Sequence, residues 1–435
     1  MASPKADVHN ALNRILSEPV PELSPDALQA FVAPYFEHRR HYLDAVQTHG
    51  SPLYFLDTAA LKTKAVRLKA AFDQVFSSVG YYYAVKSNNH PDVARTLLAC
   101  GFGLDVSSGL ELETALELGA RQIVFSGPGK AGHELLLAVM HADKVVVLMD
   151  SPGELERLAA VAARLKQTVR CGVRLTVNPN GLWRKFGIPL DTLADFCRAA
   201  DQHPYIRLTG LQFHASWNLS PQTQIAFIEK LGKTMGKLPP PYQKAVEFVD
   251  IGGGYWPEQG EWLHPDATPA GRVDAALGHP PEHPRPHHCL PAAAIETFAE
   301  QLGAAVRKHL FSVIPCRICI EPGRWLSHEA MHLLVTVVDK KAPDLVITDA
   351  GTNAVGWERF ENDYFPVLNL TRPALTETPC HILGSLCTPH DVWGYFYLGA
   401  AIEAGDILMI PTQGAYTYSL RQNFIKPLPK VVTAG

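Results

Sequence analysis

The sequence predicts an α/β protein: a (β/α)8 barrel followed by an all-β domain. The first observation is an alternation of short apolar segments, typical of buried parallel strands, with amphipathic helical segments. Eight such strands over about 240 residues match the usual strand number and size of this barrel. The second observation is a change of pattern after residue 325, where short β-like segments replace the helices. A doubly wound open sheet is the alternative, because counting strands does not show closure.

Three segments follow from these patterns. Residues 1–50 are expected to form a helical arm, residues 51–325 the barrel, and residues 326–435 the β domain. In the arm, Ser24-Pro25 predicts the start of a helix, since serine caps a helix and proline fits its first turn. A short strand is expected at Leu53–Leu56, and Thr58–Phe76 has apolar residues at helical spacing.

The barrel elements are identified by their periodicity. The expected strands are Tyr81–Lys86, Gly103–Val106, Ile123–Ser126, Lys144–Met149, Val169–Leu175, Leu208–His214, Glu247–Gly252 and Cys316–Ile320. The expected helices are Pro91–Ala99, Gly109–Leu118, Gly132–His141, Gly153–Lys166, Leu190–Ala200, Pro221–Met235 and Ala293–His309. The β domain is expected to contain strands at His332–Val338, Asp344–Thr348, Val367–Leu370, His381–Leu383 and Asp406–Ile410.

One segment interrupts the alternation. Tyr255–His288 is rich in proline, histidine and glycine and has no periodicity, so a long surface loop is expected. Its Glu282-His-Pro-Arg-Pro-His-His288 has the composition of a metal-binding tract, but the loop is the simpler interpretation and no metal site is predicted. Cys316-x-x-Cys319 lies in an expected strand, where positions three apart face opposite sides, which argues against a shared metal.

Composition excludes several classes of function. The chain has 435 residues, and its net charge of −4 gives no electrostatic reason to bind nucleic acid or an anionic membrane. The chain contains no run of about 18 apolar residues, the length that a helix needs to span a bilayer. Met1–Glu18 lacks the apolar core of a signal peptide, so a cytoplasmic protein is expected. The eight cysteines are scattered, and free thiols are expected.

Candidate functional residues lie at the carboxyl ends of the expected strands, where a barrel carries its site. Lys86 ends a strand of three tyrosines, alanine and valine. A lysine among apolar walls loses its charge more easily, because desolvation lowers the pKa of the ammonium, and a neutral amine attacks aldehydes. Taken alone, a strand-end lysine that reaches solvent is the commoner case.

The other strand ends supply complementary groups. Asp105 lies in the second strand, His214 ends the sixth, and Gly252-Gly-Gly254 and Glu321-Pro-Gly-Arg324 follow the last two. The glycines allow a phosphate to approach the backbone, an arginine binds anions, and a carboxylate stabilises a protonated ring nitrogen. Each feature is weak alone, since a glycine triplet is more often a turn. Together with Lys86 they match pyridoxal phosphate, whose protonated ring is an electron sink for decarboxylation.

With these residues, the chain resembles the fold type III pyridoxal-phosphate-dependent decarboxylases, the family of diaminopimelate and ornithine decarboxylases. The motifs that carry the resemblance are Tyr83-Ala-Val-Lys86-Ser-Asn, Phe213-His214, Gly252-Gly-Gly254, Glu321-Pro-Gly-Arg324, Asp349-Ala-Gly-x-Asn353, Gly384-x-x-Cys387 and Gly414-Ala-Tyr416. The resemblance implies an alanine racemase-like barrel, a β domain, and an obligate homodimer with shared active sites.

It also implies roles for individual residues. Lys86 would bind pyridoxal phosphate covalently, His214 would stack on its ring, Glu321 would pair with the ring nitrogen, and Cys387 of the partner would return a proton to Cα. The remaining cofactor contacts implied are Asp105, Gly252, Gly253, Gly254, Gly323, Arg324 and Tyr416. The substrate contacts implied are Arg324, Asp349, Thr388 and Asp391.

Three departures from the family pattern bear on the substrate. Thr388 stands where family members that bind a distal ammonium commonly carry an acid, Ser385 replaces a usual proline, and Trp217 replaces a small residue. We therefore expect decarboxylation of a diamino acid, including a modified or conjugated one. An amino-acid racemase of the same fold and a non-catalytic cofactor carrier are the alternatives. Glu321 and Cys387 argue against both, because racemases place an arginine at the ring nitrogen and carriers lack the β domain.

Overall fold

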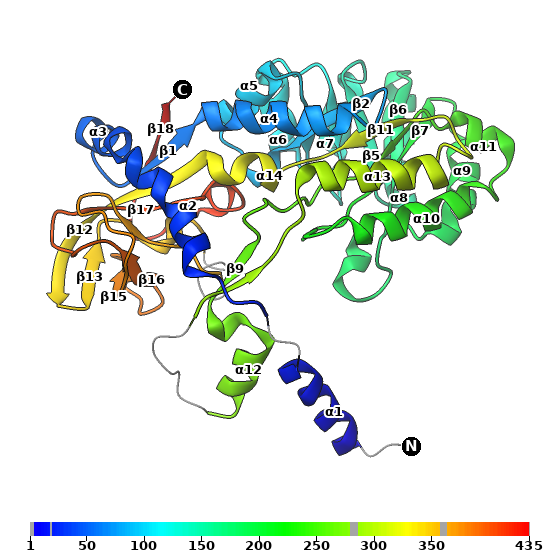
Figure 1. The fold of residues 1–435 in the computed structure, drawn as a ribbon. Coiled ribbons are helices and arrows are strands. Elements are labelled where there is room, and N and C mark those ends of the chain that lie inside the picture. Colours follow the sequence, from blue (N-terminus) through cyan, green and yellow to red (C-terminus); the bar gives the residue numbers. More distant parts are fainter. Residues whose placement is uncertain (1–3, 18–19, 279–285, 357–362, 435) are drawn as a thin grey trace.

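The computed structural model describes residues 4–17, 20–278, 286–356 and 363–434. A barrel surrounded by helices lies beside a domain made of strands, and Figure 1 shows the two in one view. Within the described ranges, every helix is too short or too polar to serve as a membrane span.

Eight parallel strands close into a barrel, as the sequence predicted. They are β2 (Val79–Ala84), β3 (Gly103–Val106), β4 (Ile123–Phe125), β5 (Val145–Met149), β6 (Val169–Leu175), β7 (Ile206–Phe213), β8 (Phe248–Asp250) and β11 (Arg317–Ile320). β11 closes the barrel by pairing with β8 on one side and with β2 on the other. Tyr82, Val124, Leu148, Phe248 and Cys319 form a cluster of buried side chains contributed by these strands. Closure excludes the open-sheet alternative.

Helices cover the outside of the barrel because their apolar faces pack on the strands (Figure 1). They are α4 (Thr58–Asp73), α5 (Pro91–Ala99), α6 (Gly109–Glu117), α7 (Gly132–Met140), α8 (Pro152–Leu165), α9 (Leu193–Ala200), α10 (Gln222–Met235), α11 (Pro240–Ala245) and α13 (Ile295–His309). Serine caps begin two of them: Ser108 accepts a hydrogen bond from the Glu111 amide, and Ser151 from the Glu154 amide. After β11, the short α14 (Arg324–Ser327) leads into the second domain.

The second domain is built on an eight-stranded sheet that takes strands from both ends of the chain. In spatial order they are β13 (Leu345–Thr348), β15 (Glu377–Leu383), β16 (Val392–Leu398), β14 (Leu368–Asn369), β17 (Ile407–Ile410), β12 (Met331–Ala342), β1 (Leu53–Asp57) and β18 (Lys430–Ala434). The strand expected at Leu53–Leu56 therefore pairs with β12 and β18 rather than with the barrel. Its four residues are all buried, so it has no polar–apolar alternation that could indicate which sheet it joins.

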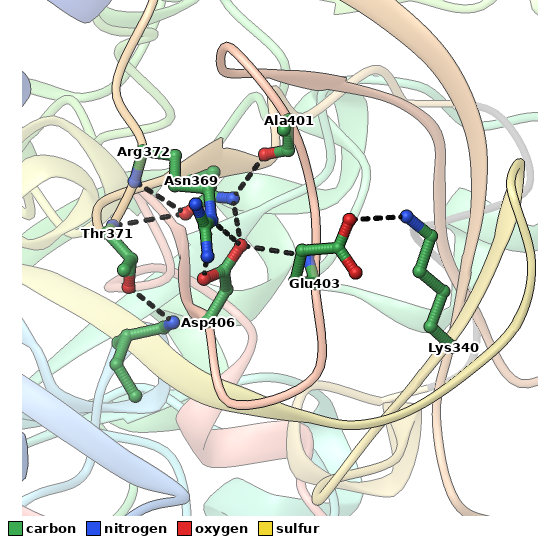
Figure 2. A network of polar contacts seen from close by, with 8 residues as sticks. Lys340, Asn369, Thr371, Arg372, Ala401, Glu403 and Asp406 are labelled. Carbon is green, nitrogen blue, oxygen red and sulfur yellow. Dashed lines mark hydrogen bonds and ion pairs between the residues drawn. The ribbon is translucent and has the colours of Figure 1, made fainter.

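A polar network fixes the turn before β17. Asp406 accepts hydrogen bonds from the Asn369 side chain at 2.8 Å and from the Glu403 amide at 2.9 Å, and pairs with Arg372 at 3.2 Å (Figure 2). The buried carboxylate is thus surrounded by donors, which offsets the cost of removing it from water.

The N-terminal arm is helical, with one helix more than predicted. α2 (Pro25–Glu37) begins where expected, with the Ser24 hydroxyl accepting from the Ala27 amide at 3.1 Å. Together with α3 (Arg39–His49), it packs on the β domain, where Tyr42 meets Phe55 edge-on at 5.0 Å. α1 (Pro4–Ser17) lies in the arm before Ser24, where no individual helix was predicted.

The segment Tyr255–His288 is not the structureless loop that was expected. It contains β9 (Glu261–Leu263), which pairs with β10 (His288–Leu290), and the helix α12 (Pro269–Ala276). Much of the histidine tract lies outside the described residues. Of the part that is described, His287 hydrogen-bonds Glu377 at 3.0 Å and stacks on Tyr364 at 3.5 Å, so it ties this segment to the β domain. Among the described residues there is no group of three metal-ligating side chains.

Candidate active site

The predicted strand-end residues meet at one rim of the barrel, because the carboxyl ends of parallel strands converge there. Lys86 lies in a single 3-10 turn, Val85–Ser87, directly after β2. His214 follows β7, the glycine triplet follows β8 after Ile251, and Glu321 follows β11. Their mutual contacts form one polar cluster in an otherwise apolar rim.

Lys86 is paired with a buried carboxylate. Its Nζ donates to Asp105 Oδ2 at 3.1 Å, and the other Asp105 oxygen accepts from the Ser126 hydroxyl. Burial lowers the pKa of the ammonium, but the charges of Asp105 and Glu321 outweigh it, so the pKa is raised overall. Burial alone predicts a lowered pKa for this amine, so that prediction is wrong, because neighbouring negative charge decides the direction. Asp105 itself is an acceptor within reach of the proton that the amine must lose.

Glu321 is a buried carboxyl of the rim. It is 2% exposed, and its Oε2 accepts a hydrogen bond from Gln212 Nε2 at 3.2 Å. Its Oε1 is buried and has no hydrogen-bond partner. Burial, followed by the charges of Asp105 and Asp250, raises the pKa of Glu321 well above its usual value. A buried acceptor without a donor is costly, and a ligand N–H at this position would satisfy it.

His214 is held as a neutral ring. The Gly253 amide donates to its Nδ1 at 3.3 Å, so Nδ1 carries no proton and the hydrogen resides on Nε2. Burial, together with the charges of Lys86 and Arg174, lowers the pKa of His214 well below its usual value. A neutral imidazole at the rim offers an uncharged flat surface to a ligand ring.

The three glycines have no room for side chains. A Cβ on Gly252 would lie 2.6 Å from the Phe213 carbonyl, one on Gly253 2.0 Å from the Glu321 carbonyl, and one on Gly254 2.3 Å from the Ala215 carbonyl. Gly252 and Gly254 also have positive φ, of 70° and 79°. The triplet is therefore wedged between the ends of β7 and β11, and only glycine fits at these three positions.

Arg324 is enclosed by aromatic rings. Its guanidinium lies 4.2 Å from the Trp256 ring, 5.0 Å from Tyr416 and 5.3 Å from Trp217. Tyr416 reaches this place because its amide donates to the Ser87 carbonyl at 2.7 Å, which links it to the Lys86 turn. The predicted residues Arg324 and Tyr416 are thus brought to the same rim as Lys86. Gly323 belongs to this junction, since a Cβ there would press on Ser87 at 3.0 Å.

The predicted residues of the β domain are placed differently. Cys387 is exposed in the loop between β15 and β16, and Thr388 follows it. Asp391 is buried, and its oxygens accept from the Leu386 amide at 2.6 Å and the Thr352 amide at 2.7 Å.

Asp349 is similarly engaged, with its oxygens accepting from the Thr336 amide at 2.9 Å and the Ser51 hydroxyl at 2.5 Å. The oxygens of Asp349 and Asp391 thus brace neighbouring loops, and the contact of these two residues with substrate stays a prediction.

Sequence reasoning missed four residues of the site. Gln212 and Asp250 are buried polar residues inside apolar strands, Ser126 binds Asp105, and Trp256 covers Arg324. The signal for the first two was available: a glutamine between Leu211 and Phe213 and an aspartate between Val249 and Ile251 interrupt buried strands. The other two depend on contacts between distant segments and left no local signal.

Pyridoxal phosphate fits this arrangement. The partnerless Oε1 of Glu321 is an acceptor for a protonated ring nitrogen, and Lys86 is an amine for the aldehyde. Arg324 supplies a cation for the phosphate at the same rim. Each of these requirements is met by an atom of the described chain.

Comparison with known proteins gives the family. A family model described as "Pyridoxal-dependent decarboxylase, pyridoxal binding domain" matches residues 61–328, well over half of the chain. The diaminopimelate decarboxylase of Campylobacter jejuni is 25% identical over 404 residues, covering 88% of this chain and 90% of that protein. The one of Neisseria meningitidis serogroup A is 27% identical over 402 residues, covering 88% and 89%.

A solved structure supports the fold. The diaminopimelate decarboxylase from M. jannaschii in complex with L-lysine matches with a TM-score of 0.75 at 24% identity, covering 90% of this chain and 89% of that one. The matched range, residues 61–328, includes Lys86 and Glu321. The chain therefore belongs to the pyridoxal-dependent decarboxylases, and its barrel is their pyridoxal-binding domain.

Proposed function

We propose that this enzyme removes the α-carboxylate of a diamino acid, or of a modified or conjugated one, as a homodimer with shared active sites. The observation that carries the decarboxylase assignment is the buried Glu321 carboxyl, whose Oε1 lacks a partner. Pyridoxal phosphate, when bound, supplies an aldehyde for the amine and a ring that withdraws electrons from Cα. A carboxylate at the ring nitrogen favours the protonated ring and so the loss of carbon dioxide.

The residues of the rim divide the remaining tasks. Lys86 holds the cofactor, and Asp105, at 3.1 Å, accepts the proton that the ammonium loses. His214 presents its neutral ring, and the glycine triplet with Arg324 binds the phosphate.

The finer proposal concerns the substrate. Thr388 is uncharged where an acid would pair with a distal ammonium, so a free second amine loses one charge-assisted contact. We therefore propose a diamino acid whose distal end is modified. The test is carbon dioxide release from ornithine, lysine, arginine, diaminopimelate and a citryl-diaminopropionate conjugate. The conjugate is expected to have the highest kcat/KM. A clear preference for a plain basic amino acid would contradict the finer proposal and leave the reaction type intact.

The shared site is tested by mixing two inactive variants. Among the described residues, no hydrogen bond or ion pair joins Cys387 to the Lys86 cluster, and its thiol is exposed. If Cys387 serves the partner's site, mixing Lys86→Ala with Cys387→Ala restores one intact site in half of the dimers. Activity is then expected to reach about one quarter of the wild-type value. Each variant alone should be low, with Cys387→Ala reduced by about 10²- to 10⁴-fold, as for loss of a general acid.

The control in this experiment is each variant incubated with wild-type protein under the same dissociating conditions. A mixture that stays as inactive as its components would show that both residues act in one chain or that Cys387 is not the proton donor.

A further inference from the structure

A second buried acid lies next to Glu321: Asp250 of β8 pairs with Cys319 of β11, two residues before Glu321, and with Gln212 of β7, which donates to Glu321. Asp250 ends β8 and is fully buried, with 0% exposure. One of its oxygens, Oδ1, accepts from the Gly252 amide at 2.8 Å. Its Oδ2 is buried without a hydrogen-bond partner, as is Oε1 of Glu321. Gln212 supplies the one side-chain donor to Glu321, at 3.2 Å, and leaves Oε1 unsatisfied.

Two carboxylates cannot satisfy each other, because both only accept hydrogen bonds and both carry negative charge. One shared proton removes both problems, since the protonated acid then donates to the other. The pKa of Asp250 follows this logic. Burial is the largest cause and raises it, the Gly252 amide lowers it, and the Asp105 charge raises it, to a value of about 7.

We propose that Asp250 is a positioning residue for Glu321: before the cofactor binds, the two buried carboxyl groups share one proton, and this hydrogen bond keeps Glu321 in place for the ring nitrogen. The proposal rests on the assignment of Glu321 in the proposed function. It adds that the ring-nitrogen site is a pair of acids, with Asp250 fixed by the Gly252 amide.

The charged groups around the pair come from several elements. Asp105 on β3 adds negative charge, and Lys86 and Arg174 add positive charge. His214 after β7 is neutral at ordinary pH, because its pKa is lowered well below the usual value.

The uncharged titratable neighbours stay uncharged. Asp250 has three such neighbours: Tyr82 on β2, Cys319 on β11, and Tyr255. Burial raises the pKa of each of them. Among these described groups, we therefore expect the carboxyls of Asp250 and Glu321 to gain or lose a proton between pH 5 and 8.

The pH dependence has a definite sign. The pKa of Asp250 is about 7 in the folded state, whereas an unfolded aspartate has a pKa near 3.9. The folded state thus binds more protons in this window. The resulting stabilisation is complete below the unfolded pKa and is lost as the pH rises through about 7.

The first test uses the protein without cofactor. Melting temperatures of the wild type and Asp250→Asn are measured from pH 5 to 8. An asparagine side chain can accept from Gly252 and donate to Glu321 without any proton uptake. The melting temperature of the wild type minus that of the variant is expected to be lower at pH 8 than at pH 5, by about 2 °C or more. A difference that stays constant with pH would overturn the proposal. If Asp250→Asn does not fold, Glu321→Gln is measured in its place. The difference in melting temperature between the wild type and Glu321→Gln must then show the same dependence on pH.

A matched control is Asp406→Asn, which alters another buried carboxylate, far along the chain in the network of Figure 2. Asp406 is paired with Arg372, so its loss should lower the melting temperature by a similar amount at each pH. A slope in this control equal to that of Asp250→Asn would assign the effect to general charge loss and contradict the proposal.

The second test separates positioning from packing. The dissociation constant of pyridoxal phosphate is measured for Asp250→Asn and Asp250→Ala. Asparagine retains a donor to Glu321 and should keep the constant within about threefold, while alanine should raise it about tenfold. Equal effects of the two changes would overturn the positioning role. Neither measurement depends on turnover, so failure to find a decarboxylase substrate would leave both results interpretable.

Discussion

Lys86→Ala is expected to abolish covalent attachment of the cofactor and lower kcat/KM by about 1,000-fold or more. The reason is that no other described side chain donates to Asp105 as an amine does, so the aldehyde has no nucleophile at this rim. The measurement is the visible absorbance of the purified, cofactor-loaded protein, followed by steady-state kinetics. The visible band should disappear.

The matched control is Lys69→Ala, which removes a half-buried lysine of α4 that donates to the Cys100 carbonyl at 3.2 Å. This lysine lies outside the site cluster, so the absorbance and kcat should be unchanged. Persistence of the visible band in Lys86→Ala would show that another amine holds the cofactor and would contradict the assignment.

Glu321→Gln is expected to lower kcat by about 10²- to 10³-fold while the cofactor remains covalently bound. Glutamine has nearly the same shape and keeps an oxygen near Gln212, but it cannot balance the charge of a protonated ring nitrogen. The electron-withdrawing power of the ring therefore falls, and the barrier to losing carbon dioxide rises. The measurements are the absorbance spectrum, which should retain a visible band, and single-turnover release of carbon dioxide.

Glu154→Gln serves as the control because it changes another deeply buried glutamate, paired with Lys130 at 2.7 Å. Leaving Lys130 without its partner should lower the melting temperature, since an uncompensated buried charge is costly. Its kcat, measured on folded protein, should stay near the wild-type value. A Glu321→Gln variant with kcat within about threefold of the wild type would contradict the role of Glu321.

The regular part of the fold was predictable from local pattern. The strand at Val169–Leu175 and the helix at Gln222–Met235 follow from apolar periodicity, which acts within a few residues. The positions of Lys86, His214 and Glu321 followed as well, because parallel strands of a barrel end at the same rim. Ser24 could be recognised as a cap because its hydrogen bond to Ala27 spans three residues.

What could not be predicted depends on partners distant in sequence. Leu53–Asp57 is apolar throughout, and only its pairing with β12 and β18 decides that it belongs to the second sheet. β9 and β10 lie in a proline- and histidine-rich segment and pair across 25 residues. Asp349 and Asp391 have the residue type of ligand-binding groups, and only their hydrogen bonds show that they hold loops together.

By itself, the sequence determined the alternation of strands and helices, the change to a β domain, and the residue types at each strand end, because these are encoded in local spacing and motifs. The tertiary structure alone decided the charge states of the rim: it set Asp105 against Lys86, so that the pKa of the ammonium rises, and enclosed Glu321 with Asp250. The physical reason is that burial and Coulomb energy depend on distances between groups far apart in the chain, which no local pattern encodes.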